Sequence, residues 1–145
     1  MPPLTDNELD NFLQKSPVAI FCTHNSDGTI HAMPLWFKYD KGEMLFATQV
    51  DTRRIKNLKK NPDVTVLVES EQFPLRGVAI YGKARMDYEN VIPTRVTMFE
   101  KYMPRANAEK LADGLAAMRK PVLIRVKPSK IVSFDYGKDP TGLFK

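Results

Sequence analysis

Apolar and polar residues alternate over much of the chain, and this period of two predicts β-strands. Val64, Val66 and Val68 share one face of such a segment. Turn-forming residues at 25–28 and 40–43, each with a glycine, separate neighbouring segments. Tight turns between successive strands indicate antiparallel pairing. The predicted strands are 18–24, 29–39, 44–48, 64–69, 78–86, 121–126 and 130–136.

Other segments have helical periodicity. A capping-box pattern at 5–8, with Thr5 and Glu8 at its ends, precedes an apolar helical face at 9–13. Further helices are predicted over 51–61, 88–102 and 106–119. The pattern as a whole predicts a mainly β fold, a closed or partly closed antiparallel barrel of about seven strands with short flanking helices. At 145 residues, the chain fits a single domain over 1–145.

Composition narrows the class of protein further. The hydrophobic share of 43% and charged share of 27% are typical of a globular protein. The first residues lack a basic, then apolar, secretory pattern, and no apolar run approaches the roughly 20 residues of a membrane helix. The single cysteine, Cys22, lies in a predicted strand and is expected to be a reduced core thiol. We therefore expect a cytoplasmic protein without a membrane partner.

The formal net charge of +5 is concentrated in one short segment. Arg53, Arg54 and Lys56, with Lys59 and Lys60 after them, are opposed there only by Asp51. Because a helix N-terminus offers free amides and arginines bind phosphate, this segment is a candidate phosphate site in which Thr48 and Thr52 add hydroxyls. Asp51 is expected to cap the helix. A solvated basic helix face explains the same pattern.

A second candidate feature is the stretch 31–37, His31-Ala32-Met33-Pro34-Leu35-Trp36-Phe37, from which Met33, Pro34, Leu35 and Trp36 are selected as candidate cofactor-binding residues. A proline inside a strand cannot donate to the ladder, so Pro34 indicates an edge, a bulge or a ligand-facing interruption. An aromatic ring system could lie against this exposed backbone and Trp36. A barrel strand with an edge proline and a core tryptophan is the alternative.

Several classes of chemistry find no support in the sequence. His24 and His31 are the only histidines, and no acid or cysteine stands at metal-ligand spacing with them, so no metal site is predicted. Nucleophile-elbow, Walker and dinucleotide-binding glycine patterns are absent. Nucleic-acid binding through 53–60 is disfavoured because exposed aromatics are not interleaved with the charges.

Five motifs in order carry a resemblance to a known family: Thr-x-x-x-Asp-Gly at 23–28, Met-Pro-Leu-Trp-Phe at 33–37, Phe-Ala-Thr at 46–48, Thr-Arg-Arg-x-Lys-Asn-Leu-x-x-Asn-Pro at 52–62, and Tyr-Gly-Lys-Ala at 81–84. In this order and spacing they resemble the pyridoxamine 5′-phosphate oxidase-like superfamily. The likeness runs from about residue 18 to residue 86 and continues more loosely through 121–136.

The resemblance implies a Greek-key split β-barrel of about six to seven strands that forms a homodimer and holds FMN, or the deazaflavin coenzyme F-420, at the subunit interface. It implies that Arg53 and Arg54 hold the cofactor phosphate, with Thr52 beside them and Lys56 following. Thr48 and the backbone of 33–36 are then expected near the ring system. A basic groove through Lys59, Lys60 and Arg76 would favour the polyglutamate tail of the deazaflavin.

The sequence departs from the oxidase itself at informative positions. Where the oxidase has an Arg opening the second strand and a Gln before the glycine-containing strand, this chain has His31 or Ala32 and Gly77. Its C-terminal segment, 134–138, also lacks the Trp and Arg that grip pyridoxal phosphate. The resemblance is therefore greater to the general-stress and deazaflavin-dependent reductase branches of the superfamily than to the enzyme of pyridoxine phosphate oxidation.

The expected function is hydride transfer between the bound ring and a small organic substrate, with no catalytic side chain identified. A carrier or redox sensor that binds flavin or haem without turnover is the alternative. Reduction of bound flavin by a nicotinamide cofactor separates the two.

Overall fold

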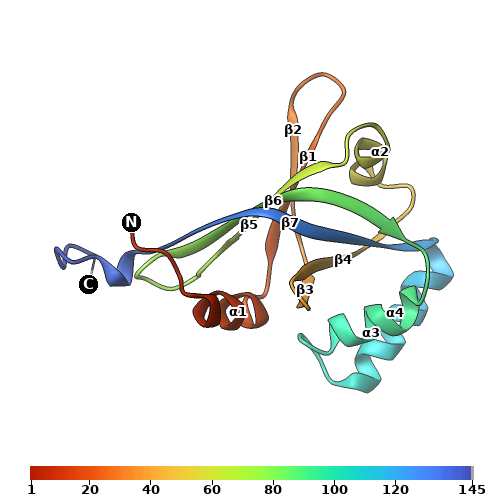
Figure 1. The fold of residues 1–145 in the computed structure, drawn as a ribbon. Helices are drawn as coiled ribbons and strands as arrows, with labels where there is room; N and C mark the ends of the chain where they lie inside the picture. The colour runs from red at the N-terminus through yellow and green to blue at the C-terminus, as the bar shows by residue number, and fades with distance from the viewer. Residues whose placement is uncertain (145) are drawn as a thin grey trace.

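The computed structural model describes residues 1–144 and is built around one antiparallel sheet. Four α-helices and a short 3-10 helix flank the sheet (Figure 1). The mainly β fold class is therefore as predicted. The strands are β1 Ala19–His24, β2 Ile30–Leu35, β3 Phe37–Asp40, β4 Glu43–Gln49, β5 Asp63–Glu69, β6 Arg76–Asp87 and β7 Pro121–Asp135; the helices are α1 Asp6–Lys15, α2 Arg53–Lys60, α3 Val91–Phe99, α4 Arg105–Met118 and the 3-10 helix η1 Tyr136–Lys138.

The predicted capping box begins α1. The Thr5 hydroxyl accepts a hydrogen bond from the Glu8 amide at 3.3 Å, and the Glu8 carboxylate accepts one from the Thr5 amide at 2.8 Å. Two of the free amides at the helix start are thereby satisfied. Phe12 and Leu13 on the apolar face are buried in the core of the sheet.

The sheet curls back on itself at Trp36. Its strand order is β2-β1-β5-β6-β7-β4-β3, so β2 and β3 form its opposite edges. Only Trp36 separates those two strands along the chain. A flat sheet would hold its two edges several strands apart, so the chain can join them only because the sheet curves into a half-barrel. The β1–β2 hairpin projects from this half-barrel beside α2 (Figure 1).

Two predicted strand boundaries were wrong, although the number of strands was right. The segment 29–39 is not one strand, because the chain leaves one sheet edge and enters the other at Trp36. The segments 121–126 and 130–136 form the single long strand β7, since pairing with β6 continues through the expected break. A bulge at Tyr81/Gly82 accommodates Pro128, which cannot donate to the ladder.

The main core fills the concave side of the half-barrel. Phe21, Phe37 and Phe46 lie at its centre and are fully buried, and the Phe21 and Phe46 ring centroids are 4.7 Å apart. Helices α3 and α4 pack against each other through a smaller cluster that includes Phe99 and Ala112. Within residues 1–144, no helix is both long and apolar enough to cross a membrane.

Candidate functional site

The predicted phosphate site lies where β4 ends and α2 begins. Thr52 is the N-cap residue of α2, but its hydroxyl does not bond the first amides of the helix. It donates instead to the carbonyl oxygen of Gln49 at 3.0 Å. The first amides of α2 therefore remain available, and they and the helix dipole favour an anion at this end.

Arg54 is fixed in place beside this helix terminus. Its Nη1 donates to the hydroxyl of Thr48 at 2.6 Å, and that hydroxyl lies 3.5 Å from the hydroxyl of Thr52. The Arg54 Nε is buried without a hydrogen-bond partner. Burial lowers the pKa of Arg54, and the nearby charge of Arg119 lowers it further, yet a guanidinium keeps its proton in proteins. An oriented cation with a free donor therefore stands at the start of α2.

His31 from β2 completes the cluster, and it was not assigned to the phosphate site from the sequence. Burial, followed by the charges of Arg54 and Arg53, lowers the pKa of His31, so both guanidiniums are near enough to act on the imidazole. Its Nδ1 is buried and has no partner in the described part of the chain. The one hint in the sequence was that His31 stands near the position where the oxidase has the arginine that opens its second strand. That strand is far from residues 52–56 in the chain.

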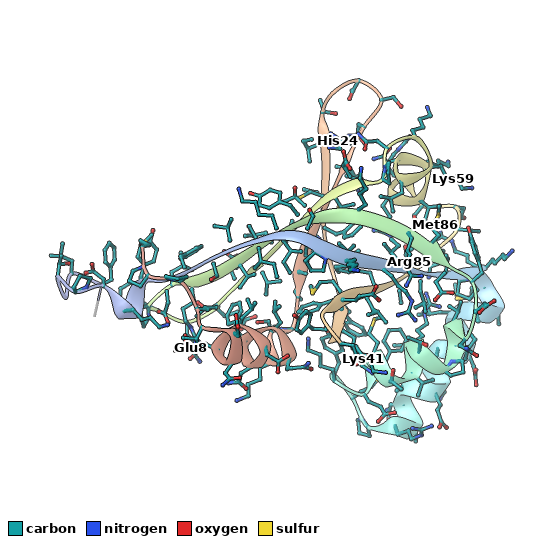
Figure 2. All side chains as sticks on the ribbon, viewed as in Figure 1. Glu8, His24, Lys41, Lys59, Arg85 and Met86 are labelled. Carbon is teal, nitrogen blue, oxygen red and sulfur yellow. The ribbon has the colours of Figure 1, made fainter. Side chains whose placement is uncertain are left out.

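A buried asparagine attaches α2 to the hairpin that carries His31. The Asn57 side-chain amide donates to Thr23 Oγ1 at 3.0 Å and to Asn25 Oδ1 at 2.9 Å. Thr23 pairs directly with His31 across β1 and β2. The position of His31 relative to α2 is therefore set by hydrogen bonds rather than by loop geometry. Figure 2 shows Lys59 on α2 beside the hairpin that carries His24.

Asp51 does not cap α2, contrary to the prediction. Its carboxylate pairs with Arg119 at the end of α4, where Arg119 Nη2 lies 2.5 Å from Asp51 Oδ1. Hydrogen bonds from Arg119 are the main reason why the pKa of Asp51 is lowered, and Lys56 contributes through its charge. Because Asp51 is already paired, it does not neutralise Arg54.

The remaining predicted phosphate residues, Arg53 and Lys56, are exposed on the first turns of α2. The charge of Arg53 acts on His31, whereas that of Lys56 acts on Asp51. Thr48, Thr52, Arg53 and Arg54 thus come together around the helix start with His31. Lys56 lies to the side, toward Asp51 and Arg119.

The stretch 33–36 lies at the exposed edge of the sheet. Met33 and Pro34 belong to the edge strand β2 and are both exposed, and an edge strand is where a proline without an N–H is tolerated. Trp36 stacks on Tyr102, with ring centroids 4.4 Å apart and planes 13° apart. Pro34, Leu35 and Trp36 line a pocket of about 390 Å³ beside α3 and α4.

Further predictions from the sequence concerned a basic groove, the single cysteine and metal binding. Arg76 lies over the Phe12 ring of α1 at 5.4 Å, whereas Lys60 contacts Ser26 on the hairpin, so these two do not share the groove expected of them. Cys22 is only partly buried, and burial raises the pKa of its thiol. The described part of the chain holds no cluster of three or more His, Cys, Asp or Glu side chains suited to a metal ion.

Comparison with known proteins agrees with this fold. The family model described as pyridoxamine 5′-phosphate oxidase matches residues 5–133. Because this match covers most of the chain, the chain belongs to the pyridoxamine 5′-phosphate oxidase family. A search of curated proteins finds no match.

Solved structures show the same architecture in proteins of different names. A conserved hypothetical protein from Mycobacterium tuberculosis is 25% identical, with a TM-score of 0.80 over 91% of this chain and 85% of its own. An F-420 reductase is 19% identical, with a TM-score of 0.68 over 85% and 94% of the two chains. HutZ, the haem storage protein from Vibrio cholerae, is 19% identical, with a TM-score of 0.68 over 90% and 93%.

Proposed function

We propose that the protein binds the phosphate of FMN, or of the deazaflavin coenzyme F-420, at the start of α2 and works as a flavin-type oxidoreductase. The observation that carries this proposal is the pair of buried nitrogens without partners, Arg54 Nε and His31 Nδ1, beside the free first amides of α2. Unsatisfied buried polar atoms and an unneutralised positive charge are costly unless a ligand satisfies them.

The residues around the helix start suit a phosphate group. Arg54 is held by Thr48, and Arg53 adds a second, flexible guanidinium. Two arginines and a helix N-terminus match the double negative charge and the three acceptor oxygens of the FMN phosphate monoester, and they also suit the single charge of the F-420 phosphodiester. Thr52 brings a hydroxyl to the same point. Arg53, Arg54, Thr48 and Thr52 would hold the phosphate, with Lys56 beside it.

The ring system would lie toward the sheet edge formed by Met33, Pro34, Leu35 and Trp36. The free edge of β2 offers backbone groups that have no partner strand. When bound, a flavin or deazaflavin supplies hydride transfer to or from an organic substrate. The chain's own part is to position the ring, to exclude water and to hold cations near it.

An exposed apolar row on the outer face of the sheet supports a homodimer. Ile20, Leu67, Ala79 and Val132 are directly paired across β1, β5, β6 and β7. Leu67 is 38% exposed and Val132 45% exposed, so the row is open to solvent in one copy of the chain. A contiguous apolar surface of this kind marks an interface, and a second copy would also provide a second wall for an aromatic ring.

A carrier or sensor without turnover is the second candidate, and the likeness to the haem storage protein HutZ favours considering it. The described site contributes binding groups but no side chain held as a general acid or base. For haem, His24 is exposed on the hairpin and His31 lies near two arginines. The groups at the helix start therefore suit a phosphate better than a haem iron.

Two titrations of the purified full chain test this proposal. FMN and F-420 are added in turn, and binding is followed by the visible absorbance and fluorescence of each ring. If FMN binds, NADH or NADPH is added and reduction of the bound FMN is followed. If F-420 binds, it is supplied in its reduced form with an artificial electron acceptor, and its reoxidation is followed. Binding with turnover supports an oxidoreductase, and binding without reduction or reoxidation supports the carrier. If neither cofactor binds, the proposal is wrong.

A further inference from the structure

A second pocket with a buried cation lies on the other side of β4 from the phosphate site. It has a volume of about 390 Å³ and is bounded by the β2–β3 junction, β4, α3 and α4. Its walls are mainly apolar and include Trp36, Met98, Phe99, Leu111 and Leu115. Pockets of this size and composition bind small organic molecules.

Arg95 of α3 is the single charged residue lining this pocket. It is only 1% exposed and is among the largest fully buried side chains of residues 1–144. Its Nη2 donates to the backbone carbonyl of Thr48 at 3.1 Å, while Nε and Nη1 have no hydrogen-bond partner. No ion pair in the described part of the chain involves Arg95.

A structural role alone does not account for this arrangement. A neutral side chain with one donor would be enough to bond the Thr48 carbonyl. A guanidinium carries five N–H donors and a permanent charge. Burial lowers the pKa of Arg95, but the group stays protonated. A buried charge without a counter-ion is destabilising, and the ring of Phe99, 6.0 Å from the guanidinium carbon, compensates only in part.

We propose that this pocket binds a small carboxylic acid, with its carboxylate on Arg95 and its apolar body against Trp36, α3 and α4. A carboxylate carries the one negative charge that one guanidinium neutralises, and it accepts several N–H bonds. A phosphate dianion would keep an excess charge among apolar walls. Gln49 also lines the pocket, and its neutral side-chain amide offers one further polar contact to the acid.

The pocket connects this inference to the proposed function. Pro34, Leu35 and Trp36 line it, and they also form the sheet edge expected beside the cofactor ring. Thr48 connects the two sites, since its hydroxyl binds Arg54 and its carbonyl binds Arg95. The role of the acid as a substrate rests on the proposed function. The binding of the acid to Arg95 does not depend on that function.

The test follows the Nε–H signal of Arg95 in ¹H–¹⁵N spectra of the full chain. A buried guanidinium gives a protected Nε–H signal, which the R95K spectrum assigns by its disappearance. The probes are 3-phenylpropionate and its uncharged counterpart 3-phenylpropanol, each with and without added FMN. We expect phenylpropionate to move the Arg95 signal at millimolar concentrations and to bind at least tenfold more tightly than the alcohol.

Three variants separate recognition of the acid from folding. R95M keeps a side chain of similar length without charge, and we expect it to bind both probes equally weakly. R95K is expected to retain a preference for the acid. R105M, which removes an exposed arginine from α4, leaves binding of the acid unchanged. If R95M does not fold, the comparison of acid and alcohol on the unaltered chain still decides.

Two results would overturn the inference. One is an unchanged Arg95 signal with millimolar phenylpropionate, both with and without FMN. The other is that FMN fully displaces phenylpropionate and that FMN alone shifts the Arg95 signal in the same way. Arg95 would then belong to the cofactor site. Failure of FMN to bind, with phenylpropionate still bound at Arg95, would disprove the proposed cofactor and leave the acid site intact.

Discussion

Arg54 donates from Nη1 to the hydroxyl of Thr48 at 2.6 Å, and this contact joins the first turn of α2 to the end of β4. It keeps a half-buried guanidinium from folding outward into solvent. The phosphate site is therefore organised by a contact between two residues six positions apart, and not only by the number of basic residues on the helix.

Replacing Thr48 with Val removes that hydroxyl at nearly constant volume. We expect FMN to bind about 10- to 100-fold more weakly to T48V, because a hydrogen bond to a charged group contributes about 1.5–3 kcal/mol. Fluorescence titration measures this affinity. Binding of phenylpropionate should not change, because Arg95 uses the Thr48 carbonyl. T97V, on the exposed side of α3, is the control. Equal FMN affinities for T48V and the unaltered chain would exclude this role for Thr48.

His31 gives a direct spectroscopic report on an anion at the site. Burial and the charges of Arg54 and Arg53 lower the pKa of its imidazole in the free protein. A bound phosphate neutralises those charges, so the pKa of His31 should rise when FMN is added. An NMR titration of the imidazole signals measures both values, and His24, exposed on the hairpin, is the internal control. A pKa of His31 that falls or stays constant on FMN binding contradicts the proposed geometry.

Lys101 makes stability depend on pH. Burial lowers its pKa to about 8, and its Nζ lies 3.7 Å from the centroid of the Phe37 ring. Between that value and the ordinary lysine pKa of about 10.4, the unfolded chain binds more protons than the folded one, so this group makes folding more favourable as pH rises through that window. Below about pH 8 both states are protonated and the destabilisation is fully present.

Urea unfolding at pH 7.5 and 9.5 tests the effect of Lys101 by comparing the unaltered chain with K101M. The free energy of unfolding of the unaltered chain should rise relative to that of K101M at the higher pH. Staying below pH 10 avoids the titration of Tyr102, whose pKa is raised by burial. A relative free energy that is constant or falls between the two pH values would contradict the burial of Lys101.

Gly82 tests the β6–β7 bulge. A Cβ at this position would lie 2.5 Å from the Lys127 carbonyl oxygen, so G82A should lower the free energy of unfolding by about 1–3 kcal/mol. G114A is the matched control: its Cβ meets open space within α4, and the change should stabilise the protein by about 0.5–1 kcal/mol. Similar unfolding curves for the two variants would mean that the backbones do not approach closely at the bulge.

Features determined by neighbouring residues could be predicted from the sequence. The capping box at Thr5 and Glu8 and the turns at Gly28 and Gly42 depend on residues a few positions apart. The break at Trp36 could not be predicted, because it arises where the curled sheet brings its two edges together. Local propensity favours a continuous strand there.

The candidate site shows the same division. The grouping of Thr52, Arg53 and Arg54 at a helix start is a local property and was predicted. The pairing of Asp51 with Arg119 joins residues 68 positions apart, and it removed the expected cap. Arg95 is the one charged residue of the mainly apolar helix α3, and its burial against the Thr48 carbonyl arises from tertiary packing that the sequence of the helix does not reveal.

The proposed function depends above all on binding of a cofactor phosphate at the start of α2. The most direct measurement compares the affinity of the full chain for FMN with that for riboflavin, and for F-420 with that for its chromophore, which lacks the phosphate together with the polyglutamate tail. Two charge-assisted contacts predict that at least one phosphorylated ligand binds about 100-fold more tightly than its counterpart. R53A/R54A should abolish this preference, whereas K59A/K60A should retain it. Equal affinities within both pairs, or an unchanged preference in R53A/R54A, would contradict the account.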